Sequence, residues 1–586
     1  MKKLLIIPIL LGNCLFAQAS QEQSEMDISK FVANANDYSI DREYSDMIEN
    51  SPYKNVPQNK NLNNTLKTKN APIKNQENNQ TKTPSSQNQK PIITKYKFHI
   101  DNEGETFESL KVSEEELQEL LIDFRTKKFE IKDLQDISNI ISYFFQINGY
   151  PSATAYVPQQ ELTDSIQVNI ALGVLGKYII NNQTGTRDYA IESKLNQKLK
   201  GKIITIKTIE DSVYRVNEMY GVEALAALQA GENYGETDIV INVEQTQKVS
   251  AMVYGDNYGS QGAGIYRGGI NVTFNNVARQ GDSGSVFLQR SDEQQTNYGI
   301  SYTTFYGNFK VTTGYSQGSY ALGGELEDMG ISGTSKDLTV NVSYPVFLTT
   351  TASLYLTSGF AYRDLKDYMM IWGFWPNDTF KHSFAYKFGI EGTYNGLSNN
   401  NFSYSAIITH GTVIGDNDNV RYANQQQRFL GQFAKLNVNI NNSYFFHPLL
   451  THVATISYQQ VINGAKLDSS ETMSLGGPYG VRAYRNGEAD RDNAIIGNFG
   501  LRFTSPIPNF YITPFYDIGY AWFNKHAYGD DLFMDAFGLE LLYIKPGSFY
   551  AKLDAARALH TYEDKDLGVK DGKPRARIYF SAGKYF

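Results

Sequence analysis

Several features that would place this chain in a common class are scarce in its 586 residues. It has one cysteine, Cys14, only three tryptophans, and a formal net charge of just −8. A single cysteine excludes an internal disulfide framework, and so small a charge is not typical of a nucleic-acid binder. No stretch beyond the N-terminus has eighteen uninterrupted apolar residues, so the sequence offers no typical transmembrane helix.

Aromatic residues and glycine are abundant instead. The chain contains 41 tyrosines, 33 phenylalanines and 48 glycines, at a mean hydropathy of −0.41. This balance is typical of twisted strands with aromatic belts at a membrane boundary. Because lipid offers no partner for unpaired backbone groups, a membrane protein without apolar helices must be a closed β-barrel.

The N-terminus resembles a secretory signal. Two lysines precede an apolar stretch at residues 4–16, and a small-residue exit ends at Ala19. This pattern predicts a signal peptide over residues 1–19 that is removed on export. Cys14 raises the alternative of a lipoprotein, but Asn13 stands where a small residue is needed. With cleavage after Ala19, the mature chain contains no cysteine.

The next two segments differ in amino-acid composition. Residues 20–50 are polar, with one short helical pattern that Asp27 would cap. In residues 51–90, 33 of 40 are Asn, Gln, Lys, Pro, Ser or Thr. Such a composition cannot bury enough apolar surface to offset its ordering entropy, so we expect a flexible linker over 51–93. The alternative, a spacer with no role, stays open.

Residues 94–174 and 175–247 show the same order of elements twice. Each unit reads as strand, helix, helix, strand, strand, and its length is roughly 75 residues, which predicts a tandem of small α+β domains. The expected elements of the first unit are residues 95–100, 114–124, 131–149, 153–157 and 165–172, and those of the second are 178–181, 189–199, 208–220, 224–229 and 238–243.

From residue 248 to 586 the helical period gives way to alternation. Residues 338–344, 384–391 and 436–441 alternate apolar and polar side chains, which suits lipid on one face and water on the other. A soluble β-sandwich also alternates, and that alternative stays open here. Strands of about 10 residues with their connections predict roughly 16 antiparallel strands around a bore too wide for side chains to fill. Phe586 ends the expected closing strand.

The sequence contains no motif that supports an enzymatic function. The seven histidines are scattered without metal-ligand spacing. Gly281, Asp282 and Ser283 superficially suggest a hydrolase nucleophile but lack the Gly-x-Ser-x-Gly pattern. We therefore predict a non-enzymatic protein with no metal, no cofactor and no nucleic-acid partner.

Four motifs resemble those of one family, in the same order. They are residues 149–160 (GYPSATAYVPQQ), 231–238 (GENYGETD), 256–260 (DNYGS) and 264–267 (GIYR). The set resembles the two-partner secretion transporters, the haemolysin secretion/activation branch of the BamA-like superfamily. In that family the two α+β units are POTRA domains and the remainder is an outer-membrane β-barrel.

A fifth motif, residues 475–484 (LGGPYGVRAY), resembles the superfamily's Val-Arg-Gly-Tyr loop. The resemblance implies that this loop folds back into the barrel and that Arg482 meets an aspartate, matched here by Asp517. An enclosed guanidinium independently needs a fixed carboxylate, although a solvated loop arginine without a partner is the alternative. Arg485 departs from the family pattern, which often has proline there. The further loop residues expected in this site are Gly476, Gly477, Val481 and Tyr484.

The resemblance implies an outer-membrane transporter with its POTRA domains in the periplasm. These domains would capture an unfolded exoprotein, and the barrel would pass it to the cell surface, where it folds, commonly into a β-helix. The family also implies that residues 20–50 form a helix that plugs the resting barrel, and that the barrel assembly machinery inserts the protein into outer-membrane lipid. The main alternative is an insertase of the same superfamily, and a passive porin is a third.

Overall fold

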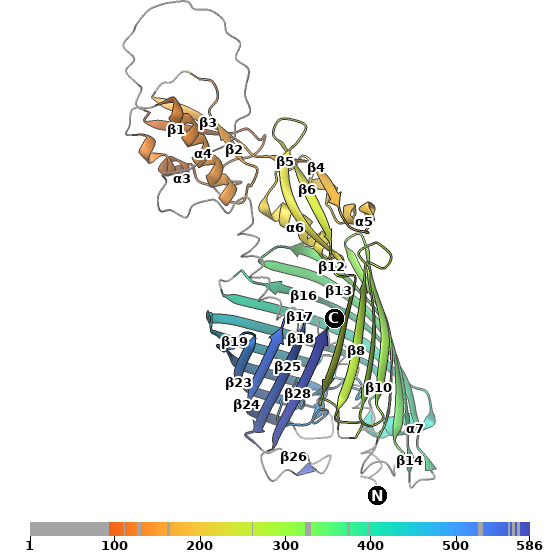
Figure 1. Ribbon diagram of the computed structural model, residues 1–586. Helices are drawn as coiled ribbons and strands as arrows, with labels where there is room; N and C mark the ends of the chain where they lie inside the picture. Colours follow the sequence, from red (N-terminus) through yellow and green to blue (C-terminus); the bar gives the residue numbers. More distant parts are fainter. Residues whose placement is uncertain are drawn as a thin grey trace, which may run out of the picture.

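The computed structural model describes residues 93–586 except for 111, 126–129, 161–163, 261, 323–329, 372–374, 397–398, 525–530, 561–562, 565–568 and 571–574. The expected signal peptide, the N-terminal helix and the linker up to residue 92 lie outside the described residues. Two small α+β units stand at one end of a wide barrel (Figure 1). We call this end of the barrel proximal and the opposite end distal.

The first α+β unit packs helices on one face of a three-stranded sheet. Its strand order is β1-β3-β2, with β1 parallel and β2 antiparallel to β3. Ile137, Ile141 and Phe145 recur every fourth residue along the longest helix and are fully buried with the inner face of β3. The elements are β1 (Lys95–Ile100), α3 (Glu114–Leu120), η1 (Ile122–Phe124), α4 (Ile131–Ile147), β2 (Thr154–Tyr156) and β3 (Ser165–Ala171).

The second unit repeats this topology with the strand order β4-β6-β5. The continuous helix expected over 189–199 is wrong, because the structure has a short helix and then a separate 3-10 turn. Ser193 bonds back to the carbonyl of Ala190, and Asn196 caps the new turn. The elements are β4 (Val174–Asn182), α5 (Asp188–Glu192), η2 (Gln197–Leu199), α6 (Ile206–Asn217), β5 (Val222–Ala230) and β6 (Glu236–Gln245).

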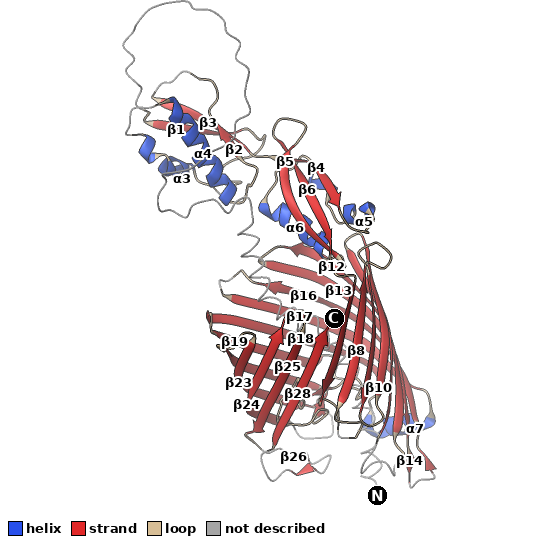
Figure 2. Cartoon of the chain, in the orientation of Figure 1, coloured by secondary structure: helices blue, strands red, loops and turns tan. Residues whose placement is uncertain are grey.

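The remainder forms a closed barrel of 16 antiparallel strands (Figure 2), which confirms the predicted number. Each strand pairs with the next, and the last strand, β28, closes the ring on β7. The strands are β7 (Val249–Asp256), β8 (Arg267–Asn275), β9 (Ser283–Ser291), β10 (Thr296–Tyr306), β11 (Phe309–Ala321), β12 (Ser332–Leu348), β13 (Ala352–Tyr368), β16 (Thr379–Tyr394), β17 (Asn400–Gly415), β18 (Gly431–His447), β19 (Leu450–Val461), β22 (Asn493–Thr504), β23 (Phe510–Trp522), β24 (Leu532–Lys545), β25 (Phe549–Ala558) and β28 (Ala576–Tyr585).

The two faces of the barrel wall have the chemistry that the alternation predicts. On β16, Phe384, Tyr386 and Phe388 are 36%, 52% and 59% exposed on the outside, while Lys381 and Ser383 are buried inside. Aromatic pairs gather at the proximal rim. Phe309 contacts Tyr344 with ring centroids 5.0 Å apart, and Tyr444 contacts Phe446 at 4.8 Å. An apolar exterior with an aromatic belt is the pattern of a barrel in a bilayer, which removes the β-sandwich alternative.

Short elements that the alternation did not predict lie in the distal loops. They are the hairpins β14 (Met370–Ile371) with β15 (Trp375–Pro376), β20 (Met473–Ser474) with β21 (Asp490–Arg491) and β26 (Glu563–Asp564) with β27 (Val569–Lys570), and the helix α7 (Asp418–Gln427). One of them, β20 with β21, lies in the loop between β19 and β22. Helix α7 begins where Asn417 caps the amide of Val420. Within the described residues, no helix has the length and apolar character needed to cross a bilayer.

The second α+β unit docks directly on the proximal rim. Glu210 of α6 accepts a hydrogen bond from the hydroxyl of Thr350 at 3.0 Å. The amide of Tyr220 donates to the carbonyl of Gly281 at 2.8 Å. Asp282 is fully buried and accepts turn amides, including that of Ala278. The Gly-Asp-Ser sequence therefore builds a rim turn.

A buried lysine lies in this junction. The ammonium of Lys194 is 3.6 Å from the ring centroid of Phe305 on β10, and the side chain has no hydrogen-bond acceptor among the described residues. Burial lowers the pKa of Lys194 to about 8. Since the free lysine holds its proton more tightly than the docked one, docking should strengthen as pH rises from about 8 towards the ordinary lysine pKa.

We therefore expect Lys194→Met to stabilise the α+β units by about 2 kcal/mol at pH 7, because the desolvation cost that it removes outweighs the attraction to Glu218 and the cation–π contact that it loses. Thermal melting followed by the helical circular-dichroism signal measures this. Lys177→Met is the matched control, since Lys177 lies exposed on the same unit. A lower melting temperature for Lys194→Met than for Lys177→Met would contradict the assignment.

Candidate functional site: a loop anchored inside the barrel

Residues 462–492 leave the distal end after β19 and fold back into the bore before β22. Leu475, Val481 and Ala483 in this loop are fully buried. The facing wall is built from small side chains, which leave room for the loop backbone. The inward-facing alanines that share this cluster are Ala494, Ala521, Ala536, Ala556 and Ala558.

Two of the expected loop glycines have a steric reason. Gly477 has a φ of +118°, a backbone conformation that other residues rarely adopt. At Gly476 an added Cβ would lie 2.4 Å from the carbonyl oxygen of Arg485. The chain therefore turns back on itself tightly enough that any side chain at Gly476 would collide with the backbone of Arg485.

The structure brings Arg482 and Asp517 together. The Nε atom of Arg482 donates to Oδ2 of Asp517 and its Nη2 atom donates to Oδ1, both at 2.8 Å. The Arg482 amide also donates to Oδ2, at 3.1 Å. The guanidinium lies 3.3 Å from the ring centroid of Phe515. This bidentate, stacked geometry suits arginine alone among the basic side chains.

Further charges surround this pair. Nη1 of Arg482 donates to Asp554 at 3.1 Å and lies 3.6 Å from Glu540. Lys552 bridges the same two carboxylates at 3.1 and 3.2 Å, and Arg502 lies 3.6 Å from Glu540. Three acidic and three basic side chains thus form one balanced network, which offsets the desolvation that each would suffer alone.

The rest of the loop tip contacts residues on both sides of the seam at which β28 closes the ring on β7. The Tyr484 hydroxyl donates to the carbonyl of His560 at 2.8 Å, and the Tyr579 hydroxyl donates to the carbonyl of Tyr484 at 2.7 Å. Asn486 donates to the carbonyl of Tyr258, in the loop that joins β7 and β8. Arg485, the departure from the family pattern, lies in a turn where its amide donates to Glu488 at 2.7 Å.

Phe586 lies at the seam itself. Its amide donates to the carbonyl of Ala251 at 2.9 Å, and its carbonyl accepts from the Ala251 amide at 3.1 Å. The end of the chain thus continues the pairing of β28 with β7.

Sequence reasoning missed Glu540, Lys552 and Asp554. Their signal was available, because each is a charged residue at an inward-facing position whose two neighbours along the strand are apolar or small. Leu539 and Leu541 flank Glu540, for example. A charge in such a place is costly without partners, so clusters of these charges predict a lumenal network.

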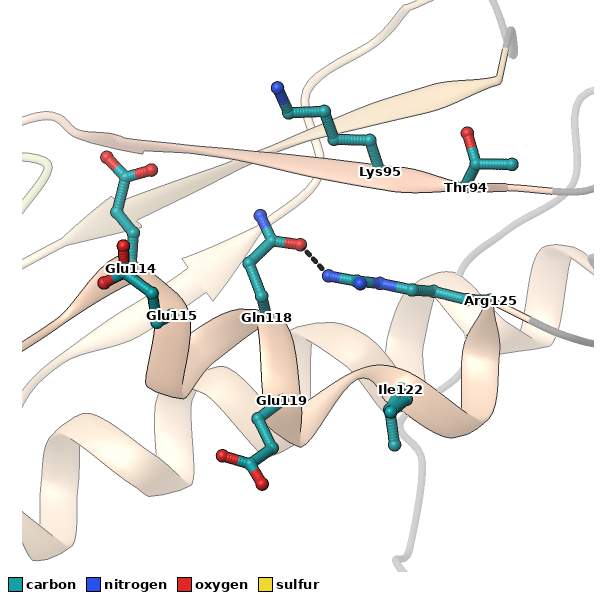
Figure 3. A pocket seen from close by; sticks show the side chains of 8 residues that line it. All are labelled: Thr94, Lys95, Glu114, Glu115, Gln118, Glu119, Ile122 and Arg125. Atoms are coloured by element: carbon teal, nitrogen blue, oxygen red, sulfur yellow. Dashed lines mark hydrogen bonds between the residues drawn. The ribbon is translucent and has the colours of Figure 1, made fainter.

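Apart from this loop site, a surface hollow lies in the first α+β unit, between α3 and β1 (Figure 3). Acidic and basic side chains mix along it, and Arg125 donates a hydrogen bond to Gln118. Gln118 in turn donates to the backbone carbonyl of Tyr96 at 2.5 Å, so part of the outer edge of β1 is already covered. No cluster of metal-ligating side chains occurs in the part of the chain that the structure describes.

Residues 235–541 match the family model described as haemolysin secretion/activation protein ShlB/FhaC/HecB. The chain belongs to this family. The heme/hemopexin transporter protein HuxB of Haemophilus influenzae strain 86-028NP is 23% identical over 471 residues, which cover 77% of this chain and 81% of HuxB. HuxB of strain KW20 is 23% identical over 432 residues, covering 71% and 74%.

Solved structures have the same fold. CdiB from Escherichia coli superposes with a TM-score of 0.62 at 16% identity, over 86% of this chain and 93% of that one. CdiB from Acinetobacter baumannii gives a TM-score of 0.58 at 16% identity, over 95% and 98%. Because the chain belongs to the secretion/activation family, its barrel lies in the outer membrane with the POTRA domains in the periplasm, and the protein is a two-partner secretion transporter.

Proposed function

We propose that this transporter captures an unfolded, secreted exoprotein at the edge of its second α+β unit. The loop that contains Arg482 then governs entry to the bore, and the client folds outside the cell. The observation that supports the transport step is a 16-stranded barrel with a polar inner face, into which the loop of residues 462–492 folds back. HuxB is a heme/hemopexin transporter protein by name, and a large β-helical client is our proposal for this chain.

Strand β5 offers the capture edge. Asn217 bonds both the amide and the carbonyl of Ala224, so these groups point away from β6. Successive residues of a strand direct their backbone groups to alternate edges, so the amides of Ala226 and Leu228 also point away from β6. Among the described residues, no backbone or side-chain group accepts from them. An extended client segment can add to this edge through backbone hydrogen bonds without a fixed sequence.

We also propose that residues 20–50 plug the resting bore and that the linker lets them leave. Deleting residues 20–50 should raise the ion conductance of the purified protein in planar bilayers, because it removes an obstacle from the water-filled path. A deletion confined to residues 60–85 of the linker is the control and should leave the conductance low. Equal conductance for the wild-type chain and the chain without residues 20–50 would remove the plug from the account.

Co-expression decides between secretion and the alternative of an insertase. A secreted, repeat-rich protein encoded beside this chain should reach the medium only when this chain is present. The levels of other outer-membrane barrels should not change. Loss of those barrels on deletion of this chain, with no effect on secretion of the neighbour, would favour the insertase instead.

A further inference from the structure

The base of the lumenal loop is held by a second set of charges. Asp468 forms an ion pair with Lys381 of β16 at 2.6 Å, and both side chains are almost fully buried. Glu471 forms an ion pair with Lys435 of β18 at 2.9 Å. Two carboxylates spaced three residues apart in the loop therefore each meet one lysine of the barrel wall.

The wall also binds the backbone of this segment. Arg363 of β13 donates to the carbonyl of Ser470 at 2.9 Å, and its Nη1 atom lies 3.5 Å from Glu471. Lys435 and Gln459 donate to the carbonyl of Glu471 at 2.7 and 3.0 Å. Residues 468–471 are thus bound as a peptide ligand would be, through acidic side chains and backbone carbonyls together.

This second anchor occupies a different arc of the barrel wall from the first. The ring runs β13, β16, β17, β18, β19, β22, β23, β24, β25, so β13 and β25 are separated by half of the strands. Arg363 is on β13 and Asp554, which binds Arg482, is on β25. The loop is therefore held by two separate charge clusters, one at its base and one at its tip.

We propose that Arg363, Lys381 and Lys435 form a carboxylate-binding face for acidic segments of the transported chain, occupied at rest by residues 468–471. An incoming acidic segment would replace the carboxylates that pair with the two wall lysines, while Arg363 keeps its ion pair with Asp337, so the wall cations are never left unpaired and the exchange costs little. Lysine is a compact, hydrated point charge and releases a partner more readily than the bidentate arginine of the first anchor. This inference rests on the proposed transport function.

The test uses the loop's own segment as the probe. A peptide with the sequence of residues 466–472 (KLDSSET) is compared with its neutral form (KLNSSQT) on the full mature chain in planar bilayers. In the variant Asp468→Asn/Glu471→Gln, the resident ligand has lost its charge. The acidic peptide should then reduce the current at about fivefold lower concentration than the neutral one, because two ion pairs distinguish them.

Two further variants fix the interpretation. Adding Lys381→Met/Lys435→Met to the double variant should abolish the preference for the acidic peptide. Asp416→Asn/Asp418→Asn removes the same amount of charge from the distal rim. This control leaves residues 468–471 charged and bound to the wall, so, like the wild-type chain, it should show no preference for the acidic peptide.

Equal block by both peptides, or a preference that survives loss of the lysines, would overturn the proposal. Should the double variant fail to assemble, Asp468→Asn alone decides by the same comparison. Because no client takes part, failure here leaves the proposed function to be tested separately by secretion.

Discussion

Arg482→Asp is expected to reduce secretion by at least about 100-fold while the barrel still assembles, because removing one partner of a buried ion pair costs about 3–5 kcal/mol. The substitution places a fourth carboxylate beside Asp517, Glu540 and Asp554, so the loop tip should leave its seat. Secreted client in the medium measures the effect, and heat-modifiable migration of the barrel on gels reports assembly.

Two variants separate pairing from a general loss of charge. Adding Asp517→Arg should restore part of the secretion, and only part, because Asp554 and Glu540 still repel the new aspartate. Arg485→Asp makes the same charge change at an exposed position three residues away and should have little effect. Equal defects in the single and double variants, with normal assembly, would argue against direct pairing of Arg482 with Asp517.

Ala226→Pro should lower client affinity about tenfold, because it removes an outward amide from β5 and about 1–2 kcal/mol of backbone hydrogen bonding with it. Proline is tolerated at this position because the missing amide points away from the ladder with β6. Co-purification of the unfolded client with the periplasmic region measures the loss.

Ala226→Ser is the matched control, since it keeps the amide and should bind the client normally. The circular-dichroism spectrum of Ala226→Pro should match that of the wild-type chain. Unchanged capture by a folded Ala226→Pro protein would place client binding elsewhere.

The architecture could be predicted because its physical signals are local. A period of two, a polar inner face and an aromatic belt predict a barrel strand without any tertiary information, and the repeat of element order predicts the tandem units. The helix expected over 189–199 failed because Ser193 and Asn196 offer the backbone competing hydrogen bonds that periodicity does not register.

The site could be predicted only in part. The loop motif pointed to Arg482 and its aspartate because both occur in a recognisable sequence context. The second anchor had no such context, because the ion pair of Asp468 with Lys381 joins residues 87 positions apart. Only the ring order of the strands brings these residues together. Long-range pairs between single charges leave no periodic trace in a sequence.

Passage of the client through the bore is the central claim, and cross-linking tests it most directly. Cys14 is the only cysteine and falls in the expected signal peptide, so single cysteines can be introduced on β18. The account predicts that a client stalled during secretion cross-links to Asn439→Cys, which faces the bore, and not to Val438→Cys, which faces lipid. Cross-linking at Val438→Cys alone, or at neither position while secretion proceeds, would contradict it.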